Sequence, residues 1–130
     1  MKIAKSFAVA FVSFIVLDFL WLGFVVKDFN LAQLSSIGRI ENGDFRINYP
    51  AAAMAYVFMA LAVAFFVRPH DTGSYVRTFL RGAFLGLIAY GIYDMTNLAI
   101  LRDYPFAFVA ADMAWGTFVF GVVSVITKRA

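Results

Sequence analysis

Four long apolar stretches constrain this chain more than any other feature of its sequence. They cover residues 6–26, 49–67, 82–101 and 106–127. Each is close to the roughly 20 residues that a helix needs to cross the hydrocarbon core of a bilayer. A helix is also the natural form for such a segment, because it satisfies its own backbone groups in lipid. The sequence therefore predicts an all-α integral membrane bundle of four transmembrane helices, forming a single domain over residues 1–130.

The composition excludes several classes of function. The chain is 63% hydrophobic, and the four stretches leave too few residues for a separate soluble domain. It contains no cysteine, which excludes disulfides, thiolate nucleophiles and sulfur-ligated metals. We also find no phosphate-binding glycine loop, nucleophilic serine motif or histidine cluster. We therefore expect no cofactor and no metal site, and we assign no catalytic residue.

The basic residues indicate how the bundle is oriented in the membrane. With four spans, the two termini and the second connection share one side, which carries seven basic residues: Lys2, Lys5, Arg68, Arg77, Arg81, Lys128 and Arg129. The other side carries four: Lys27, Arg39, Arg46 and Arg102. By the positive-inside rule, both termini are predicted to be cytoplasmic. The net charge of +3 then reflects topology, so its expected partners are anionic lipid headgroups and not nucleic acid.

The first external connection, residues 27–48, is the only long one. Within it, Leu31, Leu34, Ile37 and Ile40 recur every three residues, which favours a short amphipathic helix lying at the membrane interface, where it would act as a lid. The alternative is an irregular linker. Asn42 and Gly43 then indicate a turn.

The third stretch opens with a GxxxG motif formed by Gly82 and Gly86. Glycines at this spacing allow two helix backbones to approach closely. The sequence alone leaves open whether the motif packs helices within one bundle or joins two copies of the chain.

Three aspartates, Asp18, Asp94 and Asp112, lie inside the predicted spans. Each is eight or nine residues from the nearest charged residue on the external side, so all three share one depth. An aspartate at the centre of a membrane helix costs about 2.5–3.5 kcal/mol, so we expect all three to face the interior. No lysine or arginine lies at that depth to offset their repulsion. At least one is therefore expected to be protonated or bound to a cation.

Hydrogen-bond donors lie on the same helical faces as these aspartates. Trp21, Asn97 and Trp115 each follow an aspartate at i+3, and their N–H groups suit a carboxylate. Tyrosines from the second and third spans complete the layer. The candidate ligand- or proton-binding site comprises Asp18, Asp94, Asp112, Trp21, Trp115, Asn97, Tyr90, Tyr93 and Tyr56.

This layer predicts a protein that binds a proton, a cation or a small amphipathic or hydrophobic ligand. Transport is the function that we expect from such binding. Aromatic faces favour cations, and the depth of the layer predicts access from the external side. Because four helices are few to enclose a transport path, a transporter of this size is expected to form a homodimer.

Two other classes of function stay open on the sequence. One is an intramembrane enzyme acting on a lipid or other hydrophobic substrate, in which two aspartates share a proton as acid and base. The other is a structural or accessory subunit, in which the polar groups only bond one another across helices.

The order of four motifs resembles a known family. The motifs are "LDFLWLG" at 17–23, "NYPAAA" at 48–53, "YGIYDMTNLAIL" at 90–101 and "DMAWGT" at 112–117. In this order they resemble the bacterial membrane-protein family DUF2177 over nearly the whole chain. The resemblance implies a small four-helix, multi-pass protein of the bacterial inner (cytoplasmic) membrane. It implies no particular activity and no catalytic residues.

Overall fold

A computed structural model of the chain describes residues 2–70 and 73–130. Its four long helices are α1 (Lys2–Leu20), α3 (Tyr49–Ala62), α4 (Tyr75–Ile100) and α5 (Phe106–Arg129). Two of them continue as π-helical turns: η1 (Trp21–Val25) follows α1, and η2 (Val63–Val67) follows α3. A 3₁₀ turn, η3 (Arg68–His70), follows η2. All four helices, with their π-helical continuations, are long and apolar enough to cross a membrane. The all-α bundle of four membrane helices predicted from the sequence is confirmed.

Polar caps set where two of the helices begin. The Asn48 side chain accepts a hydrogen bond from the Ala51 N–H at 3.3 Å, with Pro50 in the first turn, where its missing N–H costs nothing. The Ser74 hydroxyl accepts from the Arg77 N–H at 3.3 Å. Helix α4 therefore begins at Tyr75, ahead of the apolar stretch at 82–101, because its polar first turns extend beyond the apolar part of the span.

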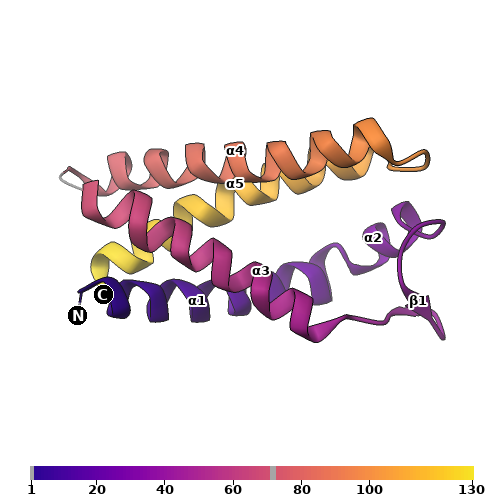
Figure 1. The fold of residues 1–130 in the computed structure, drawn as a ribbon, viewed down its shortest axis with the longest axis horizontal. Helices are drawn as coiled ribbons and strands as arrows, with labels where there is room; N and C mark the ends of the chain where they lie inside the picture. The colour runs from indigo at the N-terminus through magenta and orange to yellow at the C-terminus, as the bar shows by residue number, and fades with distance from the viewer. Residues whose placement is uncertain (1, 71–72) are drawn as a thin grey trace.

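Helices α4 and α5 form the most extensive helix pair and run antiparallel (Figure 1). Helix α5 also packs against α1, and α1 packs against α3, which crosses the bundle obliquely (Figure 1). The turns η2 and η3 bring the end of this crossing helix back to α5. Helix α5 is thus the element around which the others assemble.

The GxxxG motif packs α4 against α5 inside one bundle. A Cβ added at Gly82 would lie 2.6 Å from the carbonyl oxygen of Phe120, and one added at Gly86 would lie 2.6 Å from the Cβ of Phe120. Neither position has room for a side chain. Of the two interpretations left open by the sequence, the structure uses the motif for packing within the bundle.

An apolar layer fills the middle of the bundle. Its fully buried members are Ala10, Phe14, Ala60, Val63, Val67, Val119, Phe120 and Val123. The rings of Phe14 and Phe120 meet at its centre, with centroids 4.8 Å apart. The buried side chains of α1, α3 and α5 contribute to this layer, and the small residues of α4 close against it.

The two chain termini lie at the same end of the bundle, which we call the terminal end (Figure 1). There the Lys5 ammonium donates to the Ala130 carbonyl at 2.9 Å, and the Lys128 ammonium donates to the Gly73 carbonyl at 2.9 Å. The N-terminus, the second connection and the C-terminus therefore meet, as an even number of spans requires. Which side of the membrane this end faces stays a prediction.

The opposite end, which we call the hairpin end, carries the first connection. This connection forms α2 (Lys27–Gln33) and a two-stranded hairpin of β1 (Ile40–Glu41) and β2 (Asp44–Phe45). Asn42 and Gly43 form its turn with φ of 55° and 82°, the left-handed conformation that tight hairpins require. The helix ends at Gln33, so the three-residue apolar repeat of the sequence extends beyond it.

The close approach of α4 and α5 yields a stability prediction. Gly86→Ala is expected to lower the free energy of unfolding by about 1–3 kcal/mol, because the new methyl group overlaps α5 and forces the pair apart. Denaturant titration of the purified protein in detergent, followed by circular dichroism, measures the change. Gly23→Ala is the matched control, since nothing lies within 4 Å of an added Cβ there. An equal loss in both variants would contradict this packing.

Candidate functional site

The three intramembrane aspartates converge in the interior of the bundle. Asp18 is 5% exposed and Asp94 is fully buried. The Asp112 carboxyl lies within hydrogen-bonding reach of the Asp94 carboxyl. Tyr90 lies within electrostatic range of all three carboxyl groups. Residues from three separate helices, matched by depth in the sequence, therefore lie around one point.

Asp18 is held by donors from two other helices. The indole N–H of Trp115 donates to its Oδ1 at 2.6 Å, and the Tyr56 hydroxyl reaches the same carboxylate. Trp21 stacks flat on Trp115, with ring centroids 4.5 Å apart and planes 2° from parallel. The i+3 spacing pairs Trp115 with Asp112 on its own helix, but its donor instead crosses to Asp18, because α1 and α5 pack directly together.

Asp94 has one satisfied and one unsatisfied oxygen. The Tyr104 hydroxyl donates to its Oδ1 at 2.8 Å. The buried Oδ2 has no hydrogen-bond partner among the described residues, although the Asp112 carboxyl lies beside it. The amide of Asn97 reaches Tyr104, so it supports the donor of Asp94. A single proton between Asp94 and Asp112 would supply the missing hydrogen bond.

Tyr104 belongs to the site but was missed from the sequence. It lies in the turn before α5, outside the apolar stretches within which polar groups were sought. Its position directly before Pro105, in a turn too short to extend away from the bundle, was the available signal. Burial raises the pKa of the Tyr104 hydroxyl, and the bond to Asp94 acts in the same direction. Tyr104 therefore remains a donor across the physiological pH range.

Tyr90 lies between the Asp18 part of the site and the Asp94–Asp112 pair. Its ring packs on Gly116 of α5, where an added Cβ would overlap the ring carbons. The glycine of the "DMAWGT" motif thus makes room for this tyrosine. On the other side, the Tyr90 ring meets the edge of Phe120 in the apolar layer, with centroids 6.2 Å apart.

Tyr93 was also expected in the site but lies on the outer surface of the bundle. It is 58% exposed, whereas its neighbour Asp94 is fully buried. Successive residues of a helix point about 100° apart, and at this position the rotation places the Tyr93 side chain on the outer face of α4. Tyr93 approaches Tyr104 from outside and is not enclosed with the carboxylates.

An apolar cap covers the site toward the hairpin end. Tyr104, Phe108 and Val109 are buried there. Leu34, at the end of α2, packs against them together with Leu98 and Met113. The end of α2 therefore covers the turn that carries Tyr104.

The three carboxylates do not form a single cluster. In the part of the chain that the structure describes, no three His, Cys, Asp or Glu side chains are grouped so that they could hold a metal. The carboxylates instead divide into Asp18 with its aromatic donors and the adjacent pair Asp94 and Asp112.

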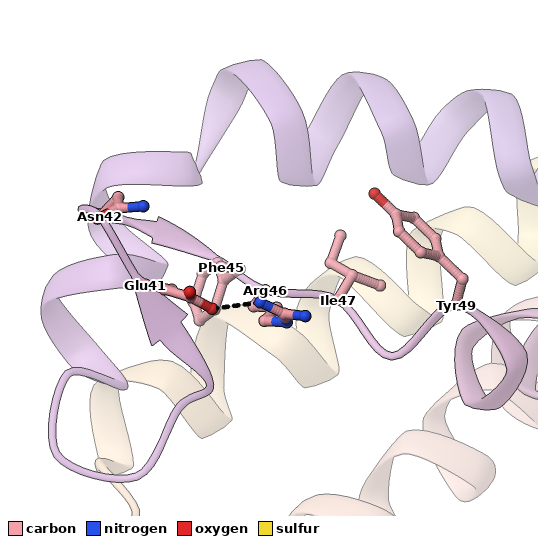
Figure 2. Close-up of a pocket in the computed structure, with 6 residues that line it drawn as sticks. All are labelled: Glu41, Asn42, Phe45, Arg46, Ile47 and Tyr49. Atoms are coloured by element: carbon pink, nitrogen blue, oxygen red, sulfur yellow. Dashed lines mark hydrogen bonds and ion pairs between the residues drawn. The ribbon is translucent and has the colours of Figure 1, made fainter.

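A separate surface hollow lies on the connection between α2 and α3. Figure 2 shows its lining residues, with the Arg46 guanidinium bonded to the Glu41 carboxylate at 2.6 Å. Its volume is about 500 Å³, and it is lined by Glu41, Asn42, Phe45, Arg46, Ile47 and Tyr49. None of these residues belongs to the carboxylate site.

Comparison with known proteins identifies the family. The model of the family DUF2177, described as predicted membrane proteins, matches residues 3–128. The chain belongs to the DUF2177 family. The match covers nearly the whole bundle, including every residue of the carboxylate site. No curated protein and no solved structure matches this DUF2177 protein.

The Asp18 contacts yield a second stability prediction. Trp115→Phe is expected to lower the free energy of unfolding by about 1–3 kcal/mol, because it removes the N–H that satisfies a buried carboxylate. Trp21→Phe keeps that bond and loses only part of the ring stack, about 0.5–1.5 kcal/mol. Denaturant titration in detergent compares the two. If Trp21→Phe is the more damaging variant, the indole bond to Asp18 does not have this role.

Proposed function

We propose that this membrane protein couples the binding of a proton to the binding of a small amphipathic cation. The Asp94–Asp112 pair holds the proton, and Asp18 with its aromatic neighbours holds the cation. Exchange of the two is the basis of proton-coupled transport, and we propose transport of this class as the function. The structure supports the proposal through the division of three carboxylates into one pair and one aromatic-lined acid.

The buried, unpartnered oxygen of Asp94 is the observation that carries the proposal. Two ionised carboxylates in contact would repel each other, with no cation at that depth to offset them. A buried acceptor without a donor also costs about 1–3 kcal/mol. One proton on the pair removes both penalties. A pair used only as structural glue would need neither carboxyl group, since an amide bonds equally well there.

The surroundings of Asp18 support the cation half of the proposal. Its carboxylate keeps lone pairs beyond those used by Trp115 and Tyr56. The stacked rings of Trp21 and Trp115 lie next to it. A negative charge beside aromatic faces favours an organic cation. Asp18 lies within electrostatic range of Asp112, so a change of charge at one affects the other.

The orientation follows from the basic terminal end. We propose that this end faces the cytoplasm of a bacterium and that the hairpin end faces outward from the inner membrane. Seven basic residues at the terminal end against four at the other support this orientation.

The chain contains its own reporter for the proton. Its two tryptophans, Trp21 and Trp115, both lie at Asp18, so intrinsic fluorescence reports on the site alone. Wild-type protein in lipid nanodiscs is expected to show a reversible, pH-dependent change in fluorescence. Asp112→Asn is expected to abolish that change without loss of stability, because the amide N–H₂ can donate to the unpartnered oxygen of Asp94.

Asp103→Asn is the matched control for this variant. Asp103 is an exposed carboxylate at the same end of the bundle, so its loss should leave the fluorescence titration unchanged. A wild-type signal that does not depend on pH, or a titration that survives in Asp112→Asn, would contradict the proposed proton site.

Cation binding is tested with tetraphenylphosphonium, a lipophilic organic cation. We expect it to bind the wild-type protein more weakly as the pH falls, because protonation of the pair reduces the negative charge near Asp18. Asp18→Asn is expected to weaken binding by about tenfold, which corresponds to roughly 1.4 kcal/mol. Fluorescence titration and equilibrium dialysis measure the affinity. Binding that is independent of pH, or unaffected in Asp18→Asn, would reject the cation half of the proposal.

A further inference from the structure

We infer that the Asp94–Asp112 pair exchanges its proton only with the hairpin end of the bundle, through the Tyr104 hydroxyl, and that the apolar layer blocks exchange with the terminal end. The inference rests on the proposed function, to which it adds a direction of access and a path.

Tyr104 is the polar group that joins the buried pair to the hairpin end. Its hydroxyl lies 2.8 Å from Oδ1 of Asp94, and its backbone belongs to the turn between α4 and α5. Phe108, Val109 and Leu34 form an apolar cluster with Tyr104, and the Asn97 amide reaches its hydroxyl. A proton moving between the hairpin end and Asp94 therefore has this hydroxyl as its hydrogen-bonding partner.

Toward the terminal end, the buried positions become apolar within about one helical turn of the site. On α1, Asp18 is followed in that direction by Phe14 and then Ala10, both fully buried. On α3, Tyr56 is followed by Ala60 and Val63, also fully buried. The rings of Phe14 and Phe120 close the centre of this layer at 4.8 Å.

The next buried polar groups on α5 toward the terminal end are Ser124 and Thr127, both beyond Phe120. The buried Ser124 hydroxyl has no hydrogen-bond partner among the described residues, so it is not linked to the site. The Thr127 hydroxyl donates to the Val123 carbonyl of its own helix at 2.7 Å. Since proton transfer needs a continuous chain of hydrogen-bonding groups, the apolar layer interrupts the route to the terminal end. The site is thus polar toward one end of the bundle and closed toward the other.

In the proposed transfer, Tyr104 passes a proton to Asp94 and remains neutral itself. The hydroxyl proton of Tyr104 moves to Asp94, breaking the phenol O–H bond and forming a carboxyl O–H bond. In the same step the phenol oxygen takes a replacement proton from a hydronium ion at the hairpin end, which leaves water. Other titratable groups facing the pair are Tyr90 on α4, Asp18 on α1 and Tyr56 on α3. None of these three lies in the turn at the hairpin end.

The rate of proton exchange tests this path. The full chain in lipid nanodiscs is subjected to a rapid pH jump, and the tryptophan fluorescence is followed in a stopped-flow instrument. In Tyr104→Phe the ring and its packing remain but the hydroxyl is lost. We expect the relaxation to slow by roughly 100-fold, the lower range for loss of a positioned proton-transfer group.

Two matched variants control for position. Tyr49→Phe removes the hydroxyl of a tyrosine that is 73% exposed at the same end. Thr127→Val removes a buried hydroxyl at the terminal end. Both are expected to relax at the wild-type rate. An unchanged rate in Tyr104→Phe, or equal slowing in Thr127→Val, would overturn the inferred path.

The amplitude of the fluorescence change distinguishes an incorrect proton path from an incorrect proton site. No pH-dependent amplitude in the wild-type protein would reject the proposed function itself, and the path with it. A normal amplitude with an unchanged rate in Tyr104→Phe would reject only the path.

The apolar barrier has its own test, which does not depend on Tyr104. In vesicles containing a pH-sensitive dye, wild-type protein should not let protons through, whereas Phe120→Ala should produce a leak. Adding Asp112→Asn to Phe120→Ala should remove that leak. The absence of a leak in Phe120→Ala, or a leak that persists in the double variant, would show that the layer is not the barrier.

Discussion

The cost of placing carboxylates in a bilayer shapes the rest of this structure. Each of Asp18, Asp94 and Asp112 costs about 2.5–3.5 kcal/mol at a helix centre, and the bundle offers no basic residue at their depth. The protein meets this cost with neutral donors taken from other elements, namely the indole of Trp115 and the hydroxyls of Tyr56 and Tyr104. One oxygen of Asp94 is left without such a donor. That missing donor is the observation on which the proposed proton site rests.

Glycines make this arrangement possible. Gly82 and Gly86 let α4 approach α5 closely along the half of the pair nearer the terminal end, and Gly116 accommodates the ring of Tyr90 at the level of the carboxylates. Tight apolar packing therefore continues up to the site and stops there. The acids therefore lie between a buried apolar layer on one side and the hydroxyl of Tyr104 on the other.

The fold and most of the site were predictable from the sequence, because both follow from the cost of exposing groups to lipid. The lengths of the apolar stretches predict the four helices. The number of residues from each flanking charge predicts that the aspartates and Tyr56 share one depth. The i+3 spacing pairs Asp112 with Trp115, but Trp115 donates to Asp18 instead. Spacing along one helix contains no information on which helices are in contact. It also wrongly included Tyr93, which faces outward. Tyr104 was missed because a turn residue becomes part of the interior only once α2 and α5 pack around it.

The most direct test of this account is whether a carboxyl group of the Asp94–Asp112 pair is protonated at neutral pH. Infrared spectroscopy of protein carrying ¹³C-labelled aspartate detects the C=O stretch of a protonated carboxylic acid and separates it from ionised carboxylate. The account predicts such a band in the wild-type protein and in Asp18→Asn, and its loss in both Asp94→Asn and Asp112→Asn. Fully ionised aspartates at neutral pH, or a band that survives in both variants of the pair, would contradict it.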